Sequence, residues 1–198
     1  AMFMGLVGSE MCIRDRQILS SYSPNIEIYS IDEAFLEFKG FENYDLEKYG
    51  QEMRSRILKW TGIPVSIGFA PTKALAKVAN RISKKFDSKT RGVYVIDSEE
   101  KREKALKWLK IEDVWGIGYK HSERLKNHNI NKAYDFTILP DDWVRKQMSV
   151  VGLRLKKELE GESVLSLEEK RSPKKAIATT RSFETVSYTH LTLPTKDS

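Results

Sequence analysis

The chain has 198 residues, with 34 Lys+Arg against 28 Asp+Glu and 40% hydrophobic residues, which is enough for one large core or two small ones. This composition excludes collagen, coiled-coil and wholly disordered proteins, and a single cysteine, Cys12, excludes a disulfide framework or a thiolate zinc cluster. No apolar run approaches the ~20 residues of a membrane span, and the N-terminus lacks the order of a signal peptide, so we expect no membrane and a cytoplasmic location.

The two ends of the sequence are related to each other. Residues 11–15 can be encoded by DNA whose reverse complement encodes Val-Ser-Tyr-Thr-His, the sequence of residues 186–190. Both ends also resemble translated transposon-end adapters used in sequencing libraries. We therefore expect residues 1–16 and 186–198 to be non-native, and leave them out of the fold prediction. Their charges cancel, so the net charge of +6 belongs to the middle of the chain.

The first predicted domain covers residues 17–98. Apolar and polar residues alternate on both sides of Asp32 and Glu33, which predicts two strands that meet at an acidic turn. Apolar side chains at steps of three or four predict a helix over 45–60. A βαβ unit with parallel strands is then predicted from a strand over 63–69, a helix that opens at Pro71-Thr72 and a strand over 92–96.

Beyond Ile96 every periodic stretch is helical, so we place a domain boundary near residues 97–100. The second predicted domain, residues 99–165, contains helices over 99–110, 119–128, 132–138, 141–148 and 150–160. Residues 166–185 are basic and form a predicted linker. Apolar residues surround the four tryptophans in sequence, so we expect all four in the core: Trp60, Trp108, Trp115 and Trp143.

Positive charge is concentrated in residues 73–91, which hold seven bases and one acid. Four of these bases are spaced to share one helix face opposite the apolar face: Lys73, Lys77, Arg81 and Lys84. Such a face is usually just solvated, although it also suits a nucleic-acid contact. Lys73 lies at the helix start, where N–H groups attract phosphate, and the alternative is an ordinary solvated lysine.

Two further motifs suggest chemistry. The carboxylates of Asp32 and Glu33 are suited to Mg²⁺, which binds one or two carboxylates together with substrate phosphates, although an ordinary acidic turn would have the same sequence. Gly116-Ile117-Gly118 is typical of a tight turn between helices whose N–H groups bind a DNA phosphate without reading sequence. A plain helical hairpin is the alternative interpretation.

In chain order, three segments resemble the Y-family translesion DNA polymerases, in particular the UmuC-type branch, the catalytic subunit of bacterial DNA polymerase V. They are Tyr29-Ser-Ile-Asp-Glu-Ala-Phe-Leu36, Pro64-Val-Ser-Ile-Gly-Phe-Ala-Pro-Thr-Lys-Ala-Leu-Ala-Lys-Val-Ala-Asn80 and Asp113-Val-Trp-Gly-Ile-Gly118. The likeness covers nearly all of residues 17–185. It departs at Asn129, where the family usually has glycine, but Asn tolerates a left-handed backbone.

The resemblance implies an α+β fold, with a partial polymerase palm in residues 17–98 that holds the βαβ unit and the acidic strand turn, followed by an all-helical thumb with a helix-hairpin-helix in 99–165. It implies that Asp32 and Glu33 are catalytic carboxylates that bind Mg²⁺, and that Lys73 contacts the incoming dNTP. The DNA contacts are expected at Gly116, Ile117, Gly118, Lys120, Lys77 and Arg81. Primer-template DNA is the implied partner, joined in the full-length parent by UmuD-type accessory subunits and the sliding clamp.

The family also has a metal-binding Asp on its first palm strand and a fingers domain, both expected before residue 17, and a little finger expected after residue 185. We therefore expect a parent polymerase that copies past damaged bases, and a chain that is inactive alone. A palm sheet without its first strand should expose an edge and an apolar face, and so should aggregate. The competing hypothesis is a non-catalytic module that binds duplex or damaged DNA.

Overall fold

Our computed structural model describes residues 2–8, 18–30, 32–41 and 44–168. The elements of its first half are β1 (Met2–Gly8), β2 (Ile26–Ile28), β3 (Glu33–Phe38), α2 (Leu46–Thr61), β4 (Val65–Ala70), α3 (Lys73–Lys85), α4 (Asp87–Thr90) and β5 (Val93–Val95). The second half is helical, with α5 (Glu99–Trp108), the 3₁₀ turn η1 (Ile111–Asp113), α6 (Tyr119–Asn127), α7 (Ala133–Thr137) and α8 (Asp141–Glu160).

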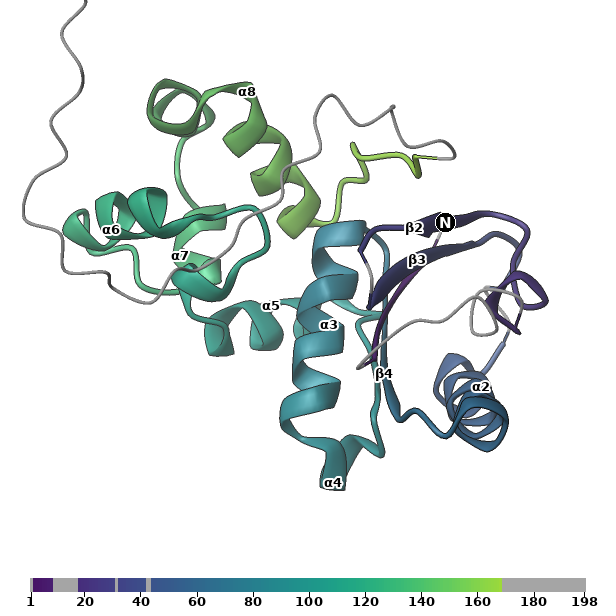
Figure 1. The fold of residues 1–198 in the computed structure, drawn as a ribbon. Coiled ribbons are helices and arrows are strands. Elements are labelled where there is room, and N and C mark those ends of the chain that lie inside the picture. The colour runs from purple at the N-terminus through teal and green to yellow at the C-terminus, as the bar shows by residue number, and fades with distance from the viewer. Residues whose placement is uncertain (1, 9–17, 31, 42–43, 169–198) are drawn as a thin grey trace, which may run out of the picture.

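The described strands form one sheet in the order β2-β3-β1-β4-β5. Neighbouring strands are antiparallel except for β4 and β5, which are parallel and are joined by α3, so the predicted βαβ unit is confirmed. Helices α2 and α3 cover opposite faces of the sheet, and α5 to α8 lie on the side of α3 away from it (Figure 1). The predicted α+β class is confirmed.

Strand β1 corrects the fold prediction, which left residues 1–16 out. Met2–Gly8 lies at the centre of the sheet and pairs with both β3 and β4. Phe3 is buried within it. The expectation that the sheet lacks a strand is wrong, because any short extended segment offers N–H and C=O groups on both edges and can satisfy both neighbours. The non-native origin of residues 1–16 and 186–198 stays a prediction, and 186–198 lie outside the described residues.

Helix α3 packs against the sheet at very close range, which fixes the side chains that it carries. A Cβ at Gly68 would lie 2.2 Å from the Asn80 backbone nitrogen, so this contact requires glycine. The buried Asn80 side chain donates from Nδ2 to the carbonyls of Gly5 (2.9 Å) and Ser66 (2.7 Å). Helix α3 is thereby held across β1 and β4.

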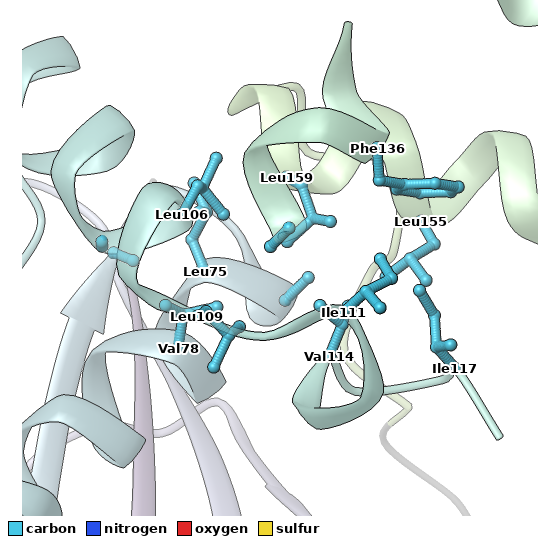
Figure 2. Packing of buried hydrophobic residues seen from close by; sticks show 14 of the residues in the cluster. Leu75, Val78, Leu106, Leu109, Ile111, Val114, Ile117, Phe136, Leu155 and Leu159 are labelled. Atoms are coloured by element: carbon cyan, nitrogen blue, oxygen red, sulfur yellow. The ribbon is translucent and has the colours of Figure 1, made fainter. Parts of the chain in front are cut away.

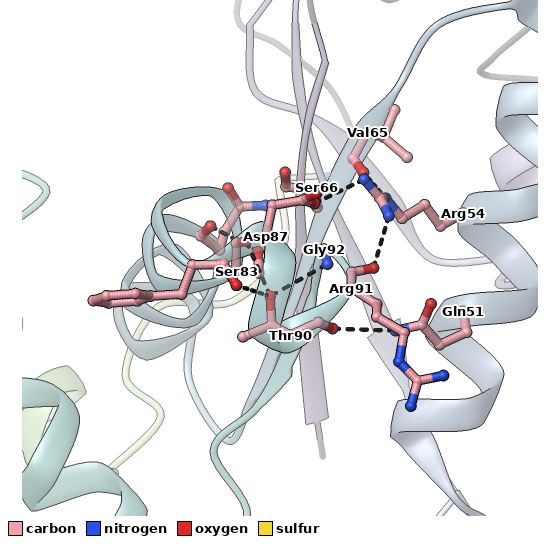
Figure 3. A network of polar contacts seen from close by, with 11 residues as sticks. Gln51, Arg54, Val65, Ser66, Ser83, Asp87, Thr90, Arg91 and Gly92 are labelled. Carbon is pink, nitrogen blue, oxygen red and sulfur yellow. Dashed lines mark hydrogen bonds and ion pairs between the residues drawn. The ribbon is translucent and has the colours of Figure 1, made fainter.

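A polar network at the other end of α3 joins that helix to α2 (Figure 3). The Arg54 guanidinium donates to the Val65 carbonyl (2.8 Å), the Arg91 carbonyl (2.7 Å) and the Asp87 carboxylate (2.8 Å). A Cβ at Gly92, where φ is +73°, would lie 2.4 Å from Arg54 Nε, so glycine leaves room for the guanidinium. The network fixes the turn between α3 and β5.

The predicted helices of the second half are all present, and α8 joins the two predicted over 141–148 and 150–160 across a break at Ser149 (φ 63°, ψ −168°). Their core is continuous with α3, since Leu75 and Leu106 belong to one buried cluster with Leu159 of α8 (Figure 2).

The prediction that Trp60 lies in the core is wrong, because its side chain is 59% exposed on α2. The other three tryptophans are half-buried.

Candidate active site

The acidic turn lies between β2 and β3, as predicted. The Glu33 carbonyl closes it by accepting from the backbone N–H groups of Tyr29 (3.0 Å) and Ser30 (3.1 Å). The Ser30 hydroxyl donates to Asp32 Oδ1 at 2.6 Å and accepts weakly from the Asp32 N–H at 3.4 Å. The turn therefore presents a half-buried Asp32 carboxylate in a fixed orientation beside the first residue of β3.

The second carboxylate of the turn faces the basic helix. Glu33 Oε1 forms an ion pair with Lys77 Nζ, and both side chains are about four-fifths buried. Glu33 and Lys77 line a cleft of about 230 Å³ together with Val78, Asn80, Arg81, Lys84, Leu109, Asp113 and Trp115. Arg81 pairs with Asp113 at 2.5 Å, and both residues line the cleft. The structure thus brings together Glu33, Lys77 and Arg81 of the predicted site.

Lys73 lies apart from this cleft in a buried position. Its ammonium forms an ion pair of 2.7 Å with Glu27 on β2, and the two side chains are only 5% and 8% exposed. It also donates to the Ser166 carbonyl at 3.3 Å and lies 5.0 Å from the centre of the Phe35 ring. The side chain of Lys73 is therefore not solvated. Its burial beside Glu27 does not favour the predicted contact with dNTP.

The same corner holds residues 162–168, the segment that follows α8. Glu158, fully buried, accepts from the N–H groups of Val164 and Leu165 at 2.8 Å with one carboxylate oxygen, and from the Ala74 N–H at 3.2 Å with the other. The Glu168 N–H donates to Glu27 at 2.8 Å. Two buried carboxylates thus fasten this segment over the N-terminus of α3. The rest of the predicted linker, from residue 169, lies outside the described residues.

Residues 116–118, predicted as the turn of a helix-hairpin-helix and called the hairpin below, lie between the 3₁₀ turn η1 and α6. Gly116 adopts φ +88°, a left-handed conformation that suits glycine, while Ile117 is buried and Gly118 is the N-cap. The carbonyl of Gly118 accepts from the N–H groups of His121 (3.0 Å) and Ser122 (2.9 Å), and the side chains of Tyr119 and Lys120 are exposed. Asn129 has φ 62°, as its substitution for glycine predicts.

Sequence reasoning missed a contact between the hairpin and the acidic turn. Trp115 Nε1 donates to the Tyr29 hydroxyl at 3.0 Å, and the two rings meet edge to face with centroids 5.5 Å apart. Both residues stood within recognised motifs, but they are 86 positions apart and no local pattern connects them.

The donor set fits Mg²⁺ bound partly by substrate. Two carboxylates at one turn match the usual magnesium arrangement, in which waters and phosphates complete the shell. No cluster of three or more His, Cys, Asp or Glu side chains suited to a metal is found in the part of the chain that the structure describes. Asp32 and Glu33 could therefore hold an ion that also contacts a phosphate, but they form no closed protein cage.

Comparison with known proteins agrees with these features. The impB/mucB/samB family matches residues 11–81. The chain is 39% identical to protein UmuC of Salmonella typhimurium, over 88% of this chain and 42% of that protein. The insertion ternary complex of Dbh DNA polymerase superposes with a TM-score of 0.62 at 29% identity, over 78% of this chain and 44% of that one. This chain is UmuC-type, of the Y family.

The UmuC-type chain is also 37% identical to DNA polymerase IV of Saccharolobus solfataricus, over 65% of this chain and 36% of that protein. It spans about two fifths of the length of the curated relatives that it matches. Among its described helices, none is long and apolar enough to cross a membrane.

Proposed function

We propose that this UmuC-type chain supplies the acidic turn and the DNA-binding thumb of a cytoplasmic translesion DNA polymerase, which transfers a nucleotide from dNTP to a primer 3′-OH. The main support is the cleft in which Glu33 faces Lys77 and Arg81, beside the tryptophan that precedes the hairpin. Phosphoryl transfer is catalysed mainly by positioning and by neutralising charge. The cleft holds the Glu33 carboxylate for a metal and the cations Lys77 and Arg81 for phosphates, and Asp32 precedes Glu33 on the turn.

Each group has a distinct part in this proposal. Asp32, oriented by Ser30, and Glu33 hold Mg²⁺, which when bound neutralises charge on the reacting phosphoryl group. Lys77 and Arg81 attract the phosphates of DNA or nucleotide, and the Gly116–Gly118 hairpin with Lys120 binds the DNA backbone independently of sequence. UmuD-type subunits and the sliding clamp are proposed partners of the whole polymerase only.

Metal and DNA binding by the chain test the proposal directly. Titration with Mn²⁺, followed by electron paramagnetic resonance, should reveal a binding site for the ion. The substitutions Asp32→Asn and Glu33→Gln should each remove this site, whereas the control Glu47→Gln, on the exposed surface of α2, should retain it.

The affinity of the chain for a duplex with a recessed 3′ end should fall steeply as the salt concentration rises. Lys120→Gln should lower the slope of log affinity against log salt by about 1. Binding that ignores salt would reject the DNA-binding role.

The chain alone should incorporate no nucleotide. Strand β1 carries no acidic residue, and the described residues offer two carboxylates at the turn. Two metal ions that bridge the attacking and leaving oxygens need more carboxylate ligands than these two. This leaves the non-catalytic DNA-binding module as the description of the isolated chain. Primer extension that requires Mg²⁺ and disappears in Asp32→Ala would overturn this prediction.

A further inference from the structure

The contact between Tyr29 and Trp115 joins the two halves of the candidate site. Tyr29 closes the acidic turn through its backbone N–H, which donates to the Glu33 carbonyl at 3.0 Å. Trp115 immediately precedes Gly116, the left-handed residue of the hairpin. A hydrogen bond of 3.0 Å, from the indole N–H to the phenol oxygen, therefore links the strand turn to the hairpin.

Ring packing makes this link stiff. The rings of Tyr29, Phe35 and Trp115 contact one another, with centroids 5.5 to 5.9 Å apart. Phe35 is buried in β3, two residues after Glu33, so the sheet anchors the cluster. Aromatic pairs of this geometry add directional attraction to the burial of their surfaces, and so they restrict how the hairpin can move over the turn.

The cluster also contacts the charged groups of the cleft. Lys77 Nζ lies 5.6 Å from the centre of the Tyr29 ring while it pairs with Glu33. A displacement of Tyr29 would therefore disturb both the backbone of the turn and the cation beside its carboxylate. Asp113, two residues before Trp115, adds a second connection through Arg81.

We propose that Tyr29 and Trp115 are a positioning pair that couples DNA binding at the hairpin to metal binding at the acidic turn, an inference that rests on the proposed function. With the contact made, the hairpin and turn hold one relative placement; with it broken, each moves independently. DNA on the hairpin and a metal on the carboxylates both favour the first state. Each ligand must then tighten the binding of the other by the same factor.

The test measures this coupling factor, with Mn²⁺ and a duplex with a recessed 3′ end as probes. Affinity for the duplex is measured by fluorescence anisotropy with and without saturating Mn²⁺, and Asp32→Asn gives the baseline effect of Mn²⁺ on DNA itself. Tyr29→Phe removes the acceptor and Trp115→Phe the donor, while both keep an aromatic ring. Each should reduce the coupling by about two- to tenfold toward that baseline, as expected for one hydrogen bond.

A double-mutant cycle and two matched controls make the result specific. Tyr29→Phe with Trp115→Phe should reduce the coupling no further than either variant alone, because both remove the same bond. Tyr94→Phe and Trp143→Phe, on β5 and α8, should retain the coupling of the original chain.

The possible outcomes separate the two proposals. If the original chain binds neither Mn²⁺ nor DNA, the proposed function fails. If it binds both but shows no coupling above the Asp32→Asn baseline, or if Tyr29→Phe and Trp115→Phe retain the full coupling while folded, the positioning role is wrong and the proposed function stands.

Discussion

The ammonium of Lys73 is enclosed by Glu27, the Ser166 carbonyl and the Phe35 ring, and this determines what loss of its partner does. Glu27→Gln would leave a buried cation without a counter-charge, so we expect it to lower the free energy of unfolding by about 3–5 kcal/mol. Combining it with Lys73→Met removes the cation as well and should restore most of that loss. Urea denaturation of the three proteins measures both effects.

The same double variant tests the nucleotide contact predicted for Lys73. If the lysine is structural, the stable Glu27→Gln, Lys73→Met protein should bind Mn²⁺-dNTP as the original chain does. Loss of nucleotide binding with full retention of stability would instead support the contact predicted from sequence. Lys77→Met is the matched comparison, since its ammonium faces the cleft.

At the scale of residues, the sequence predicts chemistry where a motif is local and misses it where partners are distant. Asp32, Glu33 and the hairpin glycines stand in short motifs, and the structure has them at a strand turn and at a helix start. The partners of Lys73 are 46 and 93 positions away in the chain. Helical spacing predicted the basic face, but whether a lysine on it is solvated depends on the segment that folds back over it.

Among the elements, helix α8 contains a strained residue that offers a sharp test. Ser149 has φ 63° and ψ −168°, a region that is essentially restricted to glycine and costs about 1–3 kcal/mol for other residues. Ser149→Gly should raise the free energy of unfolding by about 1 kcal/mol, because relief of strain exceeds the added entropy of the unfolded chain. Ser149→Ala keeps the Cβ and should give no gain. A lower melting temperature for Ser149→Gly would contradict this account.

Element boundaries were predictable where capping residues mark them. Asp45 caps α2 by accepting from the Lys48 N–H, and Gly62 and Gly161 end α2 and α8 in left-handed conformations. The sequence also separated 141–148 from 150–160, and the backbone break at Ser149 agrees with that separation. It could not show that one hydrophobic cluster runs from α3 through α8, because that packing depends on tertiary contacts.

For the whole molecule, the main difference from the sequence prediction is the strand that completes the sheet. The inverted repeat in the coding DNA concerns the origin of residues 1–16. It carries no information about whether seven of those residues can pair as a strand. The ladder is formed by backbone groups, so β1 can pair with β3 and β4 because its geometry fits between them and because Phe3 is buried there.

Deletion of residues 2–8 therefore tests the architecture as a whole. Without β1, strands β3 and β4 would face each other across a gap of about two strand spacings, with their inner N–H and C=O groups unpaired. We expect loss of the cooperative unfolding transition and of the near-ultraviolet circular dichroism signal.

A milder substitution separates packing from pairing. Phe3→Ala keeps the backbone ladder and should cost about 3–5 kcal/mol, while Met2→Ala, at a half-buried position, should cost less. If the deleted chain instead melts at the same temperature as the original, β1 contributes nothing to the stability of the fold. The sheet would then be stable with a strand missing, and α3, packed on β4, would suffice to hold the acidic turn against the helices that follow β5.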